Sequence, residues 1–420
     1  MDSPSSKRNA DTKRICILSA RNPLSDTRAL QEARSLSGAG YRVLLLGFDD
    51  SLIPGSGSIT KPDVNETFEV VCLARDRIVR FQNWGQPHMW RPVRIAANLS
   101  REWLLRHSKK TIYRQLFHSR SQANYATAYK PDLIQANDLY TLATAAEVAE
   151  KTGAVLAYDA YECFDGYFSD RKTQELVTKI EQTFLRKVRL ITSPEKWGCD
   201  DLFERYGTTA QRVTLLNGVS MIPDKITPCE VHQPIRLLSQ ASLRPGGNEE
   251  LLIKAMVHLR GKALLTIQGG GDKNTEKRLH QLALDLQVND IVSFTGRFAP
   301  DKAVQIAIDH DIGVNPIGPN NPNHDHGRGH RFFVFLAAGL ALGTAPLASI
   351  RNWPEFDKFG FLIDTTDPKR CAASLEKVIA QPEVIFKKKQ HALHCAPHYY
   401  WENAVKDYIA AIDALLTKPV

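Results

Sequence analysis

The feature that most constrains this chain is a regular alternation of short apolar segments with helix-like segments. The apolar segment at 14–20 is followed by a loop, a helical pattern that Gly40 closes, and a second apolar segment at 41–48. This order predicts a βαβ unit in a parallel sheet, because parallel strands need a crossover connection. The alternation resumes after residue 120 and again after residue 234. We therefore expect an α/β fold with two doubly wound, Rossmann-like domains.

A segment without periodicity separates the two series of strands and helices. Residues 219–234 are rich in proline and polar residues, which is typical of a linker. We assign residues 1–218 to an N-terminal domain, 235–398 to a C-terminal domain and 399–420 to a closing amphipathic helix that acts as a brace. The length of 420 residues is consistent with two or three domains.

Cysteine usage and hydropathy exclude several classes of protein. The seven cysteines include no CxxC pair, so neither a zinc site nor a disulfide framework is indicated, and a reducing compartment fits them best. The N-terminal segment lacks the apolar core of a secretion signal, and no apolar run reaches ~18 residues. We expect no membrane-spanning segment and a cytoplasmic location.

Positive charge is concentrated between residues 75 and 120, where eleven Lys or Arg accompany two acids, with Trp84, Trp90 and Trp103 interleaved. One interpretation is a solvated pair of helices. Another is a surface that binds anionic lipid headgroups, which would place the protein peripherally at the inner face of the membrane. Nucleic acid is a weaker alternative, because no nucleic-acid-binding motif accompanies the charge.

Seven segments carry a resemblance to a known family, and they occur in the family's order. They are DTRALQEARSLSGAGYRV (26–43), QANDLYTL (135–142), YDAYE (158–162), LLNGVSMIP (215–223), TGR (295–297), FFVFLAAGL (332–340) and YYWENAVKDY (399–408). Together they resemble the retaining GT-B glycosyltransferases, the family of bacterial polysaccharide glycosyltransferases and phosphatidylinositol mannosyltransferases. The resemblance implies two Rossmann-like domains that face each other across a cleft.

The resemblance also implies an activity. A chain of this kind would move a sugar from a UDP- or GDP-linked donor to a glycan, a lipid-linked acceptor or a small molecule, with retention at the anomeric carbon. The nucleotide sugar would be a co-substrate, and no metal or other cofactor is expected. A partner glycosyltransferase is a further candidate partner.

The donor would bind the second domain, where the leaving diphosphate needs positive charge and N–H donors. The family's GRxxPxKG loop aligns with residues 241–248, and Ser242 and Gly247 stand at its two basic positions. Arg244 either replaces one of these charges or is solvated. His330 and Arg331 align with an Asn and a Lys beside the diphosphate. The predicted donor-binding residues are Arg244, Gly247, Asn248, Gly270, Arg297, His330, Arg331 and Phe332.

Two polar segments of the second domain have competing interpretations. The QGGGD segment at 268–272 follows a predicted strand, so it either cradles phosphate or forms a tight turn. The adjacent His324, Asp325 and His326 are either metal ligands or an exposed polar loop. We expect no metal site, because these residues have no distant partner.

Catalytic candidates follow predicted strands of the first domain. They are Asp138, Tyr161 and Glu162, and Tyr161 stands where the family has a histidine. A carboxylate at such a strand end either orients an acceptor hydroxyl or acts as a base, or else it caps local structure. The predicted acceptor-side residues are Asn22, Asp26, Arg28 and Asn137, with structural pairing of Arg28 to Asp26 or Glu32 as the alternative.

Four family positions are changed: Ser242, Gly247, Tyr161 and Val334, the last in place of a ribose-binding Glu. These changes motivate a second hypothesis, a catalytically degenerate GT-B protein that binds carbohydrate or assists a partner glycosyltransferase. The GT-B fold also hosts epimerases and phosphorylases, although no residue here favours them.

Overall fold

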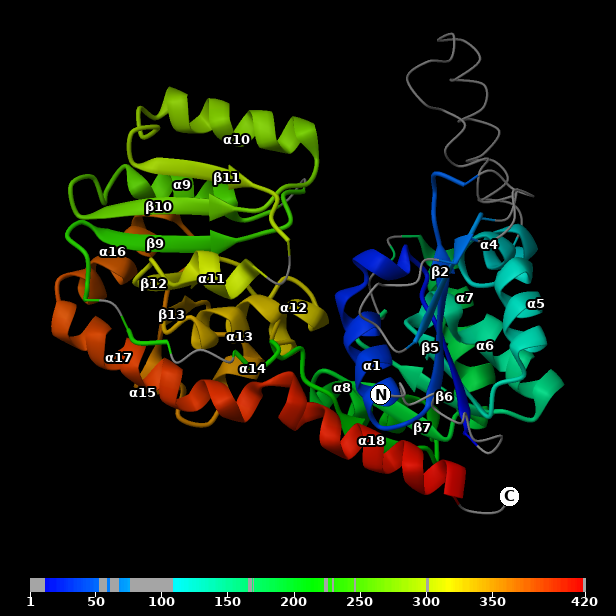
Figure 1. Cartoon of the computed structure of the whole chain (residues 1–420). Helices are drawn as coiled ribbons and strands as arrows, with labels where there is room; N and C mark the ends of the chain where they lie inside the picture. Colours follow the sequence, from blue (N-terminus) through cyan, green and yellow to red (C-terminus); the bar gives the residue numbers. More distant parts are fainter. Residues whose placement is uncertain are drawn as a thin grey trace, which may run out of the picture. The chain divides into compact units, whose positions relative to one another are not determined.

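The computed structural model describes residues 12–52, 59–60, 68–75, 109–164, 168, 170–222, 226–228, 230–244, 247–299 and 302–417. The chain forms two compact units (Figure 1): Met1–Leu215 with Val405–Val420, called unit 1, and Leu216–Ala404, called unit 2. The sequence prediction placed the first boundary at residue 218 and treated the closing helix separately. Most of the basic segment at 75–120 lies outside the described residues, as do its three tryptophans.

Unit 1 contains an eight-stranded sheet in the order β3-β4-β2-β1-β5-β6-β7-β8. All neighbouring strands are parallel except the short β3 beside β4. The strand order reverses between β1 and β5, and ligands bind at the carboxyl ends of strands at such a switch point. The strands are β1 (Arg14–Leu18), β2 (Arg42–Phe48), β3 (Ile59–Thr60), β4 (Glu69–Leu73), β5 (Leu133–Asn137), β6 (Val155–Asp159), β7 (Leu190–Ser193) and β8 (Gln211–Thr214).

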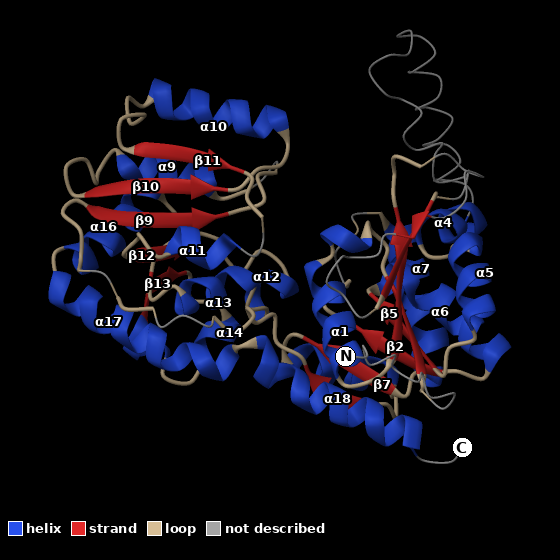
Figure 2. Ribbon diagram, viewed as in Figure 1, coloured by secondary structure: helices blue, strands red, loops and turns tan. Residues whose placement is uncertain are grey.

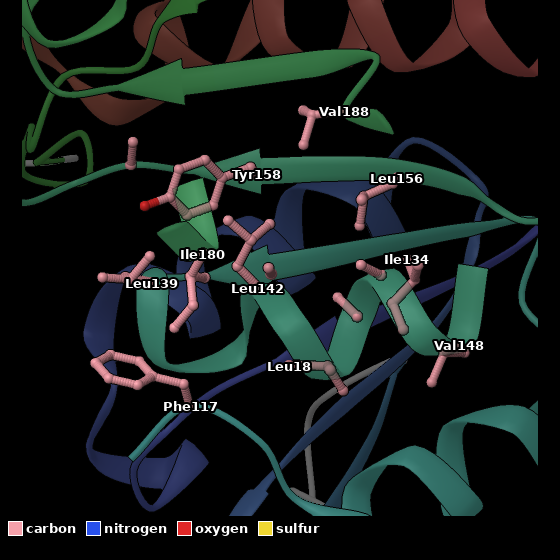
Figure 3. Close-up of a cluster of buried hydrophobic side chains, with 14 of the residues drawn as sticks. Leu18, Phe117, Ile134, Leu139, Leu142, Val148, Leu156, Tyr158, Ile180 and Val188 are labelled. Atoms are coloured by element: carbon pink, nitrogen blue, oxygen red, sulfur yellow. The ribbon is translucent and has the colours of Figure 1, made fainter. Parts of the chain in front are cut away.

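Helices cover both faces of this sheet, with α1 on one face and α5, α6 and α7 on the other (Figures 1 and 2). The helices of unit 1 are α1 (Thr27–Gly38), α4 (Lys109–Leu116), α5 (Arg120–Tyr129), α6 (Leu139–Thr152), α7 (Arg171–Phe184) and α8 (Lys196–Tyr206), with the short 3-10 helices η1 (Pro23–Ser25) and η2 (Leu185–Lys187). Figure 3 shows the apolar side chains of α6, β5 and β6 meeting between the sheet and its helices. This core holds the strand ends of unit 1 in fixed positions.

Unit 2 contains a six-stranded parallel sheet in the order β11-β10-β9-β12-β13-β14. Its strand order reverses between β9 and β12, so the carboxyl ends of these two strands flank the switch point of this sheet. The strands are β9 (Ile235–Gln240), β10 (Ala263–Gln268), β11 (Val292–Gly296), β12 (Ile312–Asn315), β13 (Ala341–Thr344) and β14 (Gly360–Leu362).

Two apolar clusters pack on the two faces of the second sheet. Leu252 of α9 and Leu375 of α16 belong to one cluster, and Phe335 of α13 and Ala392 of α17 belong to the other. The helices of unit 2 are α9 (Glu249–Met256), α10 (Lys273–Asp285), α11 (Ala303–Ala307), α12 (Pro322–His326), α13 (His330–Ala337), α14 (Ala348–Arg351), α15 (Phe356–Phe359), α16 (Pro368–Ile379), α17 (Pro382–Cys395) and the 3-10 helix η4 (Ala396–Tyr399).

The closing helix α18 (Trp401–Thr417) belongs to unit 1 from Val405 onward. Tyr408 is fully buried there, and its hydroxyl donates to Oε1 of Gln135 on β5 at 2.5 Å. The hydroxyl of Tyr41, the residue directly before β2, donates a hydrogen bond to Asp413. The last segment of the chain thus completes the fold of the first unit.

A buried ion pair joins α17 to the sheet of unit 2. Lys389 Nζ lies 2.9 Å from Asp311 Oδ1 and donates to the His310 carbonyl at 3.0 Å, and both charged side chains are almost fully buried. Asp311 also accepts from the Arg236 amide at 2.9 Å and contacts His232 Nδ1 at 3.1 Å. Although burial alone would raise the pKa of Asp311, these donors lower it.

Replacing Lys389 with Met is expected to lower the free energy of unfolding by about 3 kcal/mol, because it leaves Asp311 buried with fewer partners. Lys387→Met, an exposed position on the same helix, is the matched control and should change stability by less than about 0.5 kcal/mol. Urea unfolding at pH 7 measures both. Equal stability of the two variants would show that the buried pair contributes nothing.

Candidate functional site

Two arginines follow or adjoin the strands that flank the switch point of the second sheet. Arg244 follows β9 and is exposed, whereas Arg331, in the first turn of α13, is half-buried and donates to Oδ1 of Asn315 at the end of β12 at 3.4 Å. Burial lowers the pKa of Arg331, the charge of Glu249 opposes this, and the charge of Arg244 lowers the pKa further. Two cations that repel each other beside a single carboxylate favour the binding of an anion.

Helix α13 adds backbone donors next to Arg331. Its N-cap residue, Gly329, supplies no side-chain hydrogen bond to the first turn. The first N–H groups of a helix have no partner within the helix, and its N-terminus carries a partial positive charge. The start of α13 therefore has the chemistry of a phosphate or carboxylate site.

Gly247 and Asn248 stabilise the loop after β9. A Cβ on Gly247 would lie 2.4 Å from Oε2 of Glu249, so the glycine makes room for this buried carboxylate. Asn248 donates from Nδ2 to the carbonyl of Pro316 at 2.8 Å, which ties the loop after β9 to the end of β12. Both residues lie in the loop after β9. Their contacts position the Glu249 side chain and the loop itself.

The glycines of QGGGD are explained by close backbone packing. A Cβ on Gly269 would lie 1.8 Å from the Ala241 carbonyl oxygen, and one on Gly271 would lie 1.9 Å from that of Leu243. Leu243 and Gly271 form a parallel bridge, and the Asp272 amide donates to the Leu243 carbonyl at 2.8 Å. The side chain of Arg297 covers Gly270, where its Cγ lies 2.5 Å from the Cβ position. This close packing is sufficient to explain the glycines at 269 and 271.

His330 and Phe332, both predicted to contact the donor, make side-chain contacts within the protein. His330 Nδ1 lies 3.0 Å from the Asn217 carbonyl, so this nitrogen carries a proton and donates to it, and burial lowers the pKa of the ring. Phe332 is 3% exposed and packs edge-on against Trp353. Its amide donates to the Gly329 carbonyl at 3.0 Å. The side chain of Phe332 is part of the core, because an aromatic residue in the first turn of α13 faces the sheet.

The histidines of α12 do not form a metal centre with their neighbours. Asp325 accepts from the Ala348 amide at 2.8 Å and so anchors α14. Within the described ranges, no group of three or more His, Cys, Asp or Glu side chains is arranged to hold a metal ion. Across the same part of the chain, no helix has the length and apolar character needed to cross a membrane.

A second cluster of polar side chains lies at the switch point of the first sheet. Arg21 follows β1, Asp138 follows β5, and Tyr161 and Glu162 follow β6. Arg21 Nη2 donates to the Tyr161 hydroxyl at 2.5 Å, and its guanidinium lies 5.8 Å from the centre of the Tyr161 ring. The structure thus brings together the three predicted catalytic residues with one additional cation.

Asp138 has the properties of a proton-transfer group. Burial and the charge of Glu162 raise its pKa, against the opposing effects of the Leu139 amide, Arg21 and Tyr161. Its backbone has φ 78° and ψ 156°, a region that costs a non-glycine residue about 1–3 kcal/mol. Such strain and such a shifted carboxyl occur together at functional sites more often than elsewhere.

Two of the predicted acceptor-side residues cap local structure. Asn22 Oδ1 accepts from the Leu24 amide at 3.1 Å at the start of η1. Asp26 caps α1 by accepting from the Ala29 amide at 3.3 Å, and it also accepts from the Ser19 hydroxyl at 2.7 Å. These contacts shape the loop after β1.

Arg28 and Asn137 lie in a buried polar network beneath that loop. Arg28 donates to both carboxylate oxygens of Asp159 at 2.6 and 2.7 Å and to the Leu215 carbonyl at 2.9 Å. Its Nε lies 3.6 Å from Glu32, whose other oxygen accepts from Asn137 Nδ2 at 2.6 Å. The alternative of structural pairing therefore describes Arg28, with Asp159 as the main partner.

Sequence reasoning missed two residues of these clusters. Arg21 directly follows the first predicted strand, and a basic residue at that place is the signal that could have singled it out. Glu249 is 3% exposed beside Arg331, yet two adjacent acids before an apolar run are interpreted first as a helix start. Nothing in the local pattern reveals its burial.

Comparisons with known proteins bear on the fold. No family model matches the chain. The curated D-inositol 3-phosphate glycosyltransferase of Acidothermus cellulolyticus is 27% identical over 161 residues, which are 37% of this chain and 34% of that protein. The match thus spans about a third of the length of this relative.

Solved structures are similar over nearly the whole chain. Sucrose-phosphate synthase from Thermosynechococcus elongatus matches with a TM-score of 0.70 and 14% identity, over 96% of this chain and 99% of that one. HepE of Anabaena, solved in complex with UDP and glucose, matches with a TM-score of 0.67 and 16% identity over the same shares. WaaG, a glycosyltransferase involved in lipopolysaccharide biosynthesis, matches with a TM-score of 0.60 and 15% identity, over 97% of this chain and all of that one. With two Rossmann-like α/β units and these structural matches, this chain has the GT-B fold, as its motifs predicted.

Proposed function

We propose that the protein is a glycosyltransferase that takes a sugar from a nucleotide diphosphate donor, held at the switch point of the unit 2 sheet. The observations that carry the proposal are the position of Arg331 in the first turn of α13, which has no side-chain cap, and the position of Arg244 in the loop after β9, at the same switch point. The departing diphosphate gains negative charge as the glycosidic bond breaks, and fixed cations and N–H dipoles stabilise that charge. This arrangement supports donor binding even though Ser242 and Gly247 replace the family's usual basic residues.

The similar proteins support the class of donor. HepE was solved with UDP and with UDP-glucose, and the curated relative is named a glycosyltransferase. A UDP- or GDP-linked sugar is accordingly the proposed co-substrate, and retention without a metal follows from the family resemblance. The acceptor would be a glycan, a lipid-linked sugar or a small molecule.

The first unit would supply the groups that handle the acceptor. Asp138, with its raised pKa, could hold or receive a proton at its carboxyl oxygens. Arg21 and Tyr161 would orient the acceptor, and the hydrogen bond between them would hold their side chains in place. In this proposal Arg28 and Asn137 do not contact the acceptor. Their buried hydrogen bonds hold the strand ends in position.

Isothermal titration of the full chain with UDP and with GDP tests the donor site. We expect binding, and we expect Arg331→Gln to weaken it by about 10- to 100-fold, as a lost charge-assisted hydrogen bond contributes about 1.5–3 kcal/mol. Arg328→Gln is the matched control, because the Arg328 guanidinium lies 4.8 Å from the Trp353 ring in a cation–π contact. Failure of both nucleotides to bind would overturn the proposal.

The second candidate function is a catalytically inactive GT-B protein that binds carbohydrate or assists a partner glycosyltransferase. It is favoured by Val334, which is fully buried in the apolar core where the family has a ribose-binding Glu. Measurable release of UDP or GDP from any sugar nucleotide, lost in Arg331→Gln, would exclude this candidate. Nucleotide binding without turnover would favour it.

A further inference from the structure

His324 has a buried ring nitrogen that the fold leaves unpartnered. Its Nδ1 atom is shielded from solvent and has no hydrogen-bond partner. An unpaired buried polar atom costs about 1–3 kcal/mol, so such an atom in a folded protein needs an explanation. The residue as a whole is half-buried.

The backbone around His324 is held in place from two sides. Asn321 caps α12 and accepts from the His324 amide at 2.9 Å, while the next residue, Asp325, accepts from the Ala348 amide at 2.8 Å. Six residues separate the end of β12 from the start of this helix, which lies at the same switch point as Arg244 and Arg331. The ring is therefore presented by a fixed element and not by a free loop.

The charged groups that act on His324 are both cations. Arg244, on the segment after β9, and Arg331, on α13, lower the pKa of the ring together with burial, which is the largest cause. On its own helix, Asp325 is bound to the Ala348 amide of α14, and His326 lies 3.8 Å from Asp325. Burial and these two cations therefore disfavour the protonated form of the imidazole when no ligand is bound.

We propose that His324 is a third phosphate ligand of the donor site, and that it takes up a proton and donates a hydrogen bond when a nucleotide diphosphate binds between Arg244 and Arg331. The inference rests on the proposed donor site. A diphosphate would neutralise the two guanidinium groups that oppose protonation of the ring. It would also supply an acceptor oxygen for a ring nitrogen that the protein leaves unpaired. A charge-assisted hydrogen bond of this kind is stronger than one between neutral groups.

Titration calorimetry in buffers of different ionisation enthalpy tests the inference, because the slope of the observed enthalpy gives the number of protons taken up. The full chain is titrated with UDP, with inorganic pyrophosphate and with uridine at pH 7. We expect wild-type protein to take up more protons than His324→Gln with UDP and with pyrophosphate. We expect the two proteins not to differ with uridine, which lacks phosphate. The dissociation constant for UDP should rise at least tenfold in the variant at pH 6.5, and the effect should shrink at pH 8.5.

His326→Gln is the matched control on the same helix, and it should keep wild-type proton uptake. Thermal unfolding of both variants separates loss of the ligand from loss of the fold. UDP binding with the same proton uptake in wild type and His324→Gln would overturn the inference and leave the proposed function standing. Absence of binding by both UDP and GDP would overturn both.

Discussion

Replacing Asp138 with Asn is expected to lower turnover by about 10²- to 10⁴-fold, the usual contribution of a general acid or base. Asn has the same shape and can still accept the Leu139 amide hydrogen bond, and it meets the same backbone strain as Asp at this position. The variant therefore removes proton transfer while it preserves the local structure. The measurement is release of UDP or GDP from a panel of sugar nucleotides.

Stability of the same variant provides the control. Because the pKa of Asp138 is raised in the folded protein, folding takes up a proton, and stability falls as pH rises above the unfolded value of about 3.9. Asn carries no such penalty, so the variant should be at least as stable as wild type at pH 8, with a smaller difference at pH 4. Glu204→Gln, at an exposed acid on α8, should change neither turnover nor stability. Unchanged turnover in the Asn variant would remove Asp138 from the mechanism.

Replacing Arg28 with Ala is expected to lower the free energy of unfolding by about 3–5 kcal/mol, the range for breaking a buried ion pair. Asp159 and Glu32 are both fully buried, and without the guanidinium they would oppose each other. Arg28→Lys should give an intermediate loss, since lysine cannot contact both oxygens of Asp159 in the same plane. Thermal and urea unfolding of wild type, Arg28→Ala and Arg28→Lys measure these differences in stability.

Arg34→Ala, on the exposed face of the same helix, is the control for helix propensity and should shift stability only slightly. A residue whose role is to contact the acceptor would behave differently, since its loss would reduce turnover and leave the fold stable. Wild-type stability of Arg28→Ala would therefore contradict the buried network and restore the acceptor-side role.

Local pattern was sufficient to predict the elements of the two sheets. The apolar segments at 14–20 and 41–48 became β1 and β2, because buried parallel strands are apolar on both faces and end at turn residues. The closing amphipathic segment became α18 for a similar reason, through its helical periodicity. Strand ends could also be located, and Asp138, Tyr161 and Glu162 follow the ends of β5 and β6 as the pattern predicted.

Roles that depend on distant parts of the chain could not be predicted in this way. Arg28 meets Asp159 across 131 residues, and Tyr408 meets Gln135 across 273. A motif such as DTR indicates that its residues matter but not whether they face solvent or the core. Likewise, the three glycines of QGGGD indicate close packing, but they do not indicate which segment of backbone packs against them.

The backbone contact between residues 241–243 and 269–271 has a consequence for engineering. The backbones of the two segments pack directly on each other, so we expect a graft of only one segment from another GT-B protein to clash with the other. Arg244 and Arg297 extend from the two sides of this interlocked pair. A chimaera made to change the preference for the sugar donor should therefore fold when both segments are taken together from the same protein.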